Sequence, residues 1–376
     1  MTKLNKRTYH LYNGSRSFFD NELYDIYKKC DYKTFSQLVK ESDECRTNGK
    51  SFNSFAHILV ISNESFNGIT EQAHDRLNEL IIDLTKSDAT IYIHNPPTNL
   101  KRYLYLLNAE DKIEISEMTQ DYKINVTEDE FIKNMKAISK EIVGQSHAII
   151  EISKTMWYLT KSHRENPYVI MLYGNSSLGK TQIVREIASK FYNNNFFEKH
   201  LSMFKNNSYA DYFFGEKPNR ATLGYELLER DSNLIFLDEL DKCPEYFYSA
   251  FYTLFDNTIF KDKTYEVNVS KTLIILTSNY LSEENIKKEI GLPVYYRIDK
   301  FIKFNDFDSK TVLEVIKKEI KSREQEYSDV LTYDEIYDVV SHKVLSKGEN
   351  ARTIKYKVQK VIEDLLFQKI QDEFVK

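Results

Sequence analysis

Short runs of apolar residues recur through the middle of the chain and predict buried strands. They occupy residues 168–173, 234–237, 272–277 and 301–304. Within the first three runs, apolar positions follow one another with little polar alternation, which is typical of strands covered by helices on both faces. This part of the chain is therefore predicted to form an α/β core around a parallel sheet.

The first third of the chain mixes helix and strand patterns. Residues 21–38 predict a helix, and residues 55–61 and 89–94 predict strands. A second helix is predicted at residues 70–85, whose apolar face carries Ala73, Leu77, Leu80, Ile81 and Leu84. Alternation of strands and helices predicts a small α/β domain.

Capping signals and a change of pattern predict the domain boundaries. Thr127 and Glu130 have the spacing of a capping box, so a helix and a new domain are expected to begin there. After Asp308 the pattern is helical to the end of the chain. We expect an α/β domain of unknown role over residues 1–128, an α/β core over 129–307 and a small helical domain over 308–376.

Composition narrows the class of protein. The 376 residues carry a formal net charge of −5, and basic stretches such as residues 310–323 alternate with acidic residues, which does not favour nucleic-acid binding. No apolar run approaches the length of a membrane-spanning helix. The three cysteines, Cys30, Cys45 and Cys243, are odd in number and scattered, which favours reduced thiols. A cytoplasmic protein without a membrane partner is expected.

A phosphate-binding signature follows the run at residues 168–173. The pattern G-x-x-x-x-G-K-[ST] is matched in full by Gly174, Asn175, Ser176, Ser177, Leu178, Gly179, Lys180 and Thr181. Residues 182–188 predict a helix behind it. A strand, a turn and a helix N-terminus aim backbone N–H groups at a polyphosphate. Lys180 would reach the β- and γ-phosphates, and the Thr181 hydroxyl would hold Mg²⁺.

Polar residues end the next two buried runs. Asp238 and Glu239 follow residues 234–237, where ligands bind in open α/β sheets. Asp238 suits a Mg²⁺ shell, and Glu239 suits a general base for an attacking water. The alternative is a solvated acidic turn, which the phosphate loop disfavours. Asn279 follows residues 272–277 and could contact the γ-phosphate or the water.

Together, these motifs resemble an AAA+ ATPase of the Clp type, from about Ile142 to the C-terminus. Ile142 and Val143 are similar to the family's adenine-packing segment, and Asn279 is similar to its sensor 1. Arg297 resembles its arginine finger, and Arg352 resembles sensor 2 of a helical lid. The resemblance implies a P-loop NTPase (AAA+) core with a C-terminal lid that binds ATP and Mg²⁺ and hydrolyses the ATP.

The resemblance also implies an assembly. An arginine finger of this type acts in the site of a neighbouring subunit, so a ring of identical chains is expected, most often a hexamer in this family. Glu239, Asn279 and Arg297 would then be the catalytic residues. The alternative for Arg297 is a surface ion pair with Asp299 or Asp306.

One motif departs from the family and leaves two functions open. The Gly-Tyr-Val-Gly pore loop of Clp enzymes that thread protein is absent; Phe213, Phe214 or Tyr225 could substitute, although packing explains them more simply. The first hypothesis is an ATPase that remodels a protein partner selected by the N-terminal domain. The alternative is a nucleotide-dependent assembly platform or switch, for example in a defence or mobile-element system.

Overall fold

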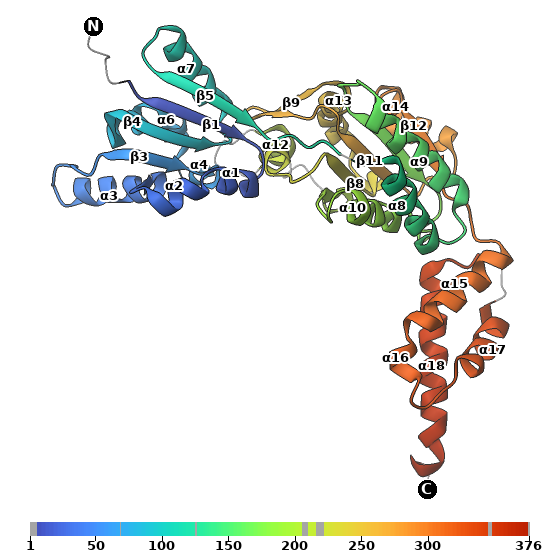
Figure 1. Cartoon of the computed structure of the whole chain (residues 1–376). Coiled ribbons are helices and arrows are strands. Elements are labelled where there is room, and N and C mark those ends of the chain that lie inside the picture. The colour runs from blue at the N-terminus through green and yellow to red at the C-terminus, as the bar shows by residue number, and fades with distance from the viewer. Residues whose placement is uncertain are drawn as a thin grey trace.

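The computed structural model describes residues 6–67, 69–124, 126–204, 210–215, 222–344 and 348–374, without the side chains of residues 71 and 372–374. Figure 1 shows an extended arrangement of three parts. The N-terminal sheet lies at one end, a second sheet with its helices lies in the middle, and a group of helices stands at the other end.

The central sheet is parallel and has the strand order β12-β6-β11-β8-β7. Its strands are β6 (Tyr168–Tyr173), β7 (Phe197–His200), β8 (Leu234–Asp238), β11 (Leu273–Ser278) and β12 (Lys300–Lys303). The strands predicted from the four apolar runs are confirmed as β6, β8, β11 and β12. The prediction missed β7, because its sequence Phe-Glu-Lys-His contains one apolar residue.

Both faces of this sheet are covered, which explains the continuous apolar runs. On one face, Ile170, Phe236 and Ile275 pack with helices α8 (Glu128–Glu141), α9 (Ser146–Lys161) and α10 (Lys180–Phe191). On the other face, Met171 and Leu237 pack with α12 (Leu223–Leu228), α13 (Tyr248–Asp256) and α14 (Glu283–Tyr295). Helix α11 (Ala210–Phe214) and the hairpin β9 (Ile259–Lys261) and β10 (Glu266–Asn268) complete the central part.

The N-terminal part is a second parallel sheet, with the order β2-β3-β4-β1-β5. Its strands are β1 (Thr8–Asn13), β2 (Lys33–Thr34), β3 (Ala56–Ile61), β4 (Thr85–His94) and β5 (Glu114–Thr119). Helices α4 (Glu64–Asn67) and α7 (Thr98–Ala109) also belong to it. The predicted strands at residues 55–61 and 89–94 correspond to β3 and β4.

Two predicted helices of this part differ from the structure. Residues 21–38 are not one helix, because the chain is extended at Cys30 and pairs with β3 through β2. They contribute instead to α1 (Arg16–Glu22), α2 (Tyr24–Lys29), β2 and α3 (Phe35–Thr47), which Thr34 caps. Residues 70–85 form α5 (Glu71–His74) and α6 (Leu77–Leu84), with non-helical backbone at Arg76 between them.

The C-terminal helices share a small apolar core of their own. They are α15 (Ser309–Ser322), α16 (Glu324–Tyr327), α17 (Tyr333–Val344) and α18 (Ala351–Phe374). Ile316, Val340 and Val358 are among its fully buried residues. Separate cores agree with the three predicted domains, whose boundaries stay a prediction. Within the described residues, no helix is both long and apolar enough to cross a membrane.

Candidate nucleotide-binding site

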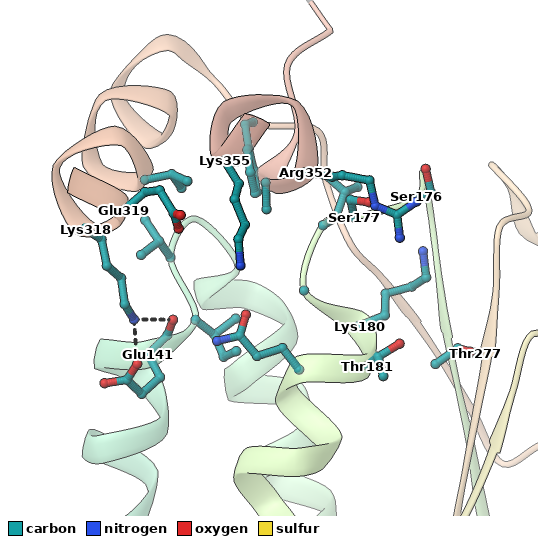
Figure 2. A pocket seen from close by; sticks show the side chains of 18 of the residues that line it. Glu141, Ser176, Ser177, Lys180, Thr181, Thr277, Lys318, Glu319, Arg352 and Lys355 are labelled. Atoms are coloured by element: carbon teal, nitrogen blue, oxygen red, sulfur yellow. Dashed lines mark hydrogen bonds and ion pairs between the residues drawn. The ribbon is translucent and has the colours of Figure 1, made fainter. Parts of the chain in front are cut away.

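A cavity of about 780 Å³ lies between the central sheet and the C-terminal helices (Figure 2). Most of the predicted site residues line it: Ile142, Val143, Ser176, Ser177, Leu178, Gly179, Lys180, Thr181, Asp238, Glu239, Asn279 and Arg352. Gly174, Asn175 and Arg297 do not line it. The strand order brings these residues together, since β11 pairs with both β6 and β8 and the three strands end at the same edge.

The loop between β6 and α10 depends on its two glycines. A Cβ atom on Gly174 would lie 2.4 Å from the carbonyl oxygen of Phe304, and the φ of Gly174 is +135°. Gly179 has a φ of +99° and precedes the first helical residue, Lys180. Only glycine adopts such conformations readily, so these two positions permit the tight turn into the start of α10. That turn presents a helix N-terminus to the cavity.

The Lys180 ammonium is held at the cavity by neutral oxygens. The residue is 7% exposed, and Nζ donates to the carbonyl oxygens of Gly174 at 2.8 Å and Asn175 at 2.7 Å. Burial lowers the pKa of Lys180 to about 8, although the carboxylates of Asp241 and Asp238 oppose the shift. A buried cation among neutral acceptors is suited to bind an anion, because phosphate oxygens would stabilise its charge.

The Asp238 carboxylate and the Thr181 hydroxyl could hold Mg²⁺. Thr181 Oγ1 lies 3.4 Å and 3.5 Å from the two oxygens of Asp238. These are the oxygen ligands that Mg²⁺ prefers, beside a space for phosphate oxygens and water. His200 Nδ1 lies 3.3 Å from Asp238 Oδ2. Sequence analysis missed His200 because it missed β7, although His200 is the register partner of Asp238 in the neighbouring strand.

Thr277 links the two acidic residues to β11. Its hydroxyl donates to Asp238 Oδ1 and accepts the backbone N–H of Glu239 at 3.0 Å. Glu239 has a φ of +59°, which a residue with a Cβ adopts rarely. Thr277 is 2% exposed, so this hydroxyl is part of the packed sheet edge. The Thr277 hydroxyl therefore holds the backbone N–H of Glu239, the residue predicted to act as general base.

Four apolar side chains line the cavity beside the end of α8. Two of them, Ile142 and Val143, belong to the central part. The other two are Phe307, which precedes α15, and Val315 within α15. Ile142 is 4% exposed and ends α8 in an extended conformation. Such a surface suits the base of a nucleotide, as the resemblance implied.

Basic side chains from the C-terminal helices also line the cavity (Figure 2). The N–H of Ala351 donates to the Ser177 carbonyl oxygen at 3.1 Å, which places the start of α18 over the phosphate loop. Arg352 and Lys355 line the cavity one helical turn apart. Lys318 on α15 also lines it and donates to a Glu141 carboxylate oxygen at 2.6 Å. Lys318 and Lys355 were not predicted, although Lys355 shares the face of Arg352 through its i,i+3 spacing.

Arg297 lies away from this cavity. Its Nε donates to Asp256 Oδ2 at 2.5 Å and Nη1 donates to the Pro293 carbonyl oxygen at 2.6 Å, while its guanidinium lies 4.5 Å from the centre of the Tyr252 ring. The alternative ion pairs with Asp299 or Asp306 are not formed. Arg164 binds both Asp299 oxygens, at 2.7 Å and 3.0 Å, and Asn175 donates to Asp306 at 2.7 Å.

The aromatic residues considered for a pore belong to the core. Phe213 is 2% exposed and stacks on Phe247 with ring centres 4.5 Å apart. Phe214 and Tyr225 are partly buried against the same cluster. Packing therefore explains these three residues. Residues 216–221, between Phe214 and Tyr225, lie outside the described residues.

Comparisons with known proteins agree with this geometry. Residues 159–335 match the family model for the AAA domain (Cdc48 subfamily). Over 282 residues the chain is 24% identical to chaperone protein ClpB of Malacoplasma penetrans, covering 66% of this chain and 39% of that protein. It is 28% identical over 155 residues to the AAA+ ATPase ClpV1 of Pseudomonas aeruginosa, covering 38% of this chain and 17% of that one.

A solved structure is similar over nearly the whole chain. Hsp104 of S. cerevisiae, in an extended conformation of its complex with casein, matches with a TM-score of 0.56 and 13% identity. The match covers 97% of this chain and 89% of that chain. By contrast, the chain spans 39% of the ClpB relative and 17% of the ClpV1 relative.

Proposed function

We propose, from the premise that this chain is a Clp-like AAA+ ATPase, that it couples ATP turnover to the remodelling of a protein partner. The predicted fold class, a P-loop core with a C-terminal helical lid, is confirmed. One observation carries the proposal for the site. A single cavity is lined by residues 176–181 of the phosphate loop, by Asp238, Glu239 and Asn279, and by Arg352 of the C-terminal helices.

The chain's own groups suggest how the phosphates would be handled. Lys180 would exchange its carbonyl partners for the β- and γ-phosphates. Thr181 and Asp238 would hold Mg²⁺, which neutralises phosphate charge when bound. Glu239 would orient the attacking water and accept its proton, and Asn279 would contact the γ-phosphate from the adjacent strand.

We further propose that Arg297 completes the site of a neighbouring chain in a ring, most often a hexamer in this family. Arg297 does not line the cavity of its own chain, which supports action in trans. Asp256 and Pro293 engage Nε and Nη1, and these contacts orient the guanidinium at the surface.

ATP binding and hydrolysis by three variants test the site. Glu239→Gln should retain ATP and stall turnover, because its loop and lysine are intact while the base is lost. Lys180→Ala should fail to bind ATP. Arg297→Ala should bind ATP but hydrolyse it more slowly. The loss should be about 10³-fold or more if Arg297 acts as arginine fingers do in GTPases. Normal turnover in any of them would contradict the assigned role.

Mixing two inactive variants tests action in trans. Arg297→Ala chains retain Glu239, and Glu239→Gln chains retain Arg297. Where such chains adjoin, one complete site can form, so the mixture should hydrolyse ATP faster than the sum of the two separate proteins. A mixture no more active than that sum would show that Arg297 does not act across a subunit boundary.

A tagged model substrate distinguishes remodelling from a switch. Sustained, ATP-dependent unfolding supports remodelling, with Glu239→Gln as the matched control. Assembly that responds to ATP without unfolding supports the alternative of an assembly platform. Selection of the partner by the N-terminal domain, the domain bounds 1–128, 129–307 and 308–376, and a cytoplasmic location remain predictions.

A further inference from the structure

The N-terminal domain rests on two connections of the ATPase core (Figure 1). One connection follows α12 and runs into β8, and the other is the β9–β10 hairpin that leads to β11. The contacts are hydrogen bonds from Ser17 to Asp231 (2.7 Å), from the Thr98 N–H to the Thr264 carbonyl (2.9 Å), from Tyr122 to the Arg230 carbonyl (3.0 Å) and from Arg102 to Glu266 (3.3 Å).

Glu229 makes the most enclosed of these contacts. Its Oε1 accepts hydrogen bonds from Nδ2 of Asn63 at 3.1 Å and from Nδ2 of Asn95 at 3.2 Å. Asn63 and Asn95 are 0% and 1% exposed and follow β3 and β4. Glu229 therefore lies at the carboxyl ends of the N-terminal strands, the edge at which open α/β sheets bind ligands.

Other buried polar groups surround the same carboxylate. Tyr265 of the hairpin donates to Asn63 Oδ1 at 3.1 Å, so both core connections contact the same asparagine. His94 is 1% exposed, and its Nε2 lies 2.8 Å from the Gly14 carbonyl oxygen. His94 Nδ1 lies 3.7 Å from Glu229 Oε1 and has no hydrogen-bond partner. Removal of the carboxylate would take away the Nδ2 acceptor of the buried Asn63, which is costly, whereas Asn95 Nδ2 would keep the Gly14 carbonyl oxygen at 2.8 Å.

The contact between Arg102 and Glu266 across the same junction is more exposed than the contacts of Glu229. Arg102 and Glu266 form an ion pair at 3.3 Å, but their side chains are 70% and 35% exposed. Such pairs contribute little because water and salt screen them. The Glu229 side chain is itself 23% exposed, but its partners Asn63 and Asn95 are fully buried, so we expect docking to depend on Glu229 more than on Glu266.

The neighbour of Glu229 ties the two connections together. Arg230 is 6% exposed and donates to Asn233 Oδ1 at 3.1 Å and to the Asn268 carbonyl oxygen at 2.6 Å. Asn233 in turn donates to the Ser270 carbonyl oxygen at 3.2 Å. Asn233 precedes β8, whereas Asn268 and Ser270 precede β11. These hydrogen bonds lie at the starts of β8 and β11, the strands whose C-terminal ends carry Asp238 and Thr277.

We propose that Glu229 is a positioning residue that docks the N-terminal domain and, through Arg230, holds β8 and β11 in the register that catalysis requires. The proposal rests on the proposed ATPase function. It gives the N-terminal domain a route to the nucleotide site, because a partner that moves this domain would act on both connections at once. The asparagine side chains at this edge of the sheet bind a carboxylate that the chain itself supplies.

The rate of disulfide formation between the N-terminal domain and the core measures how closely the two are docked. Ser17→Cys and Asp231→Cys replace hydrogen-bonded neighbours across the junction, in a chain whose Cys30 and Cys45 are changed to serine. Cys243 can remain, because it is 7% exposed and burial raises the pKa of its thiol to about 12. Adding Glu229→Ala should slow disulfide formation about tenfold or more, because the buried Asn63 amide loses its acceptor across the junction. Glu229→Gln keeps an acceptor oxygen and should recover most of the rate, and Glu266→Ala should change it little.

Steady-state ATPase kinetics, measured without the crosslinking substitutions, test the coupling. Glu229→Ala should lower kcat about fivefold or more, as expected when the buried Asn63 amide loses its acceptor, with KM for ATP and ATP affinity unchanged. Glu229→Gln should restore kcat, and Glu266→Ala should match the parent chain. Unchanged crosslinking, or undocking with unchanged kcat, would overturn the proposal. A parent chain without ATPase activity would overturn the proposed function and the positioning role, while crosslinking would still decide whether Glu229 docks the domain.

Discussion

Asp241 holds both the backbone and the side chain of Asn279. Asp241 Oδ1 accepts the Asn279 backbone N–H at 3.1 Å, and Oδ2 accepts from its Nδ2 at 3.3 Å. The Asn279 Oδ1 atom therefore faces Lys180, whose Nζ donates to it at 3.3 Å. Asp241 thus determines how the side-chain amide of Asn279 is oriented toward Lys180.

Asp241→Ala should lower kcat about tenfold while ATP still binds, because Asn279 loses its two acceptors and with them its orientation. Single-turnover hydrolysis and ATP titration would separate the two effects. Lys242→Ala is the control, since Lys242 contacts Asp241 at 2.9 Å from an exposed position and should change kcat little. Equal losses in the two variants would contradict an orienting role for Asp241.

Thr277→Val should reduce kcat about tenfold or more with little change in ATP affinity. The valine keeps the shape but removes the hydroxyl that contacts Asp238 and the Glu239 N–H, leaving buried groups unpaired. Thr277→Ser retains the hydroxyl and should recover most of the activity. If serine and valine were equally impaired in kcat measurements, the methyl group and not the hydroxyl would be what matters.

Gly174→Ala should destabilise the fold and lower its melting temperature by several degrees. The new Cβ would meet the Phe304 carbonyl oxygen at 2.4 Å, in addition to the strain of a positive φ. Gly49→Ala provides a matched control, because Gly49 also has a positive φ, +64°, but no atom within 4 Å of the added Cβ. Calorimetry that gave the same melting temperature for both variants would show that the close approach to Phe304 is unimportant.

Cys243 should be the least reactive thiol of the chain. Burial raises its pKa to about 12, so at pH 8 it is neutral in the folded protein, and only the thiolate attacks an aromatic disulfide reagent. Cys30 and Cys45 are partly exposed and should react first. Denaturant should make Cys243 react at the rate of the other two. Rapid labelling of Cys243 in the native protein would contradict the burial.

The predicted strands and the phosphate loop could be found from local sequence alone. Ile170 and Met171 pack on opposite faces of the central sheet, so consecutive positions had to be apolar. The loop from Gly174 to Thr181 is contiguous because successive backbone N–H groups must surround one phosphate group. The capping box of Thr127 and Glu130 is equally local and is confirmed by reciprocal hydrogen bonds.

Contacts between distant segments could not be found in this way. The strand β7 has a polar sequence and forms through pairing with β8, so His200 was missed beside Asp238. The helix predicted over residues 21–38 was wrong because pairing with β3 draws part of it into β2. In both cases a tertiary partner outweighed the local pattern.

The sequence by itself determined the phosphate-loop motif and the acidic end of the following buried strand, since each is encoded by neighbouring residues, while Arg352 stays a site residue predicted from the family resemblance. The tertiary structure alone decided that Arg297 pairs with Asp256, and that Glu229 reaches Asn95 across 134 positions of sequence. Folding selects such partners by packing and burial, and no local spacing records which distant surfaces will meet.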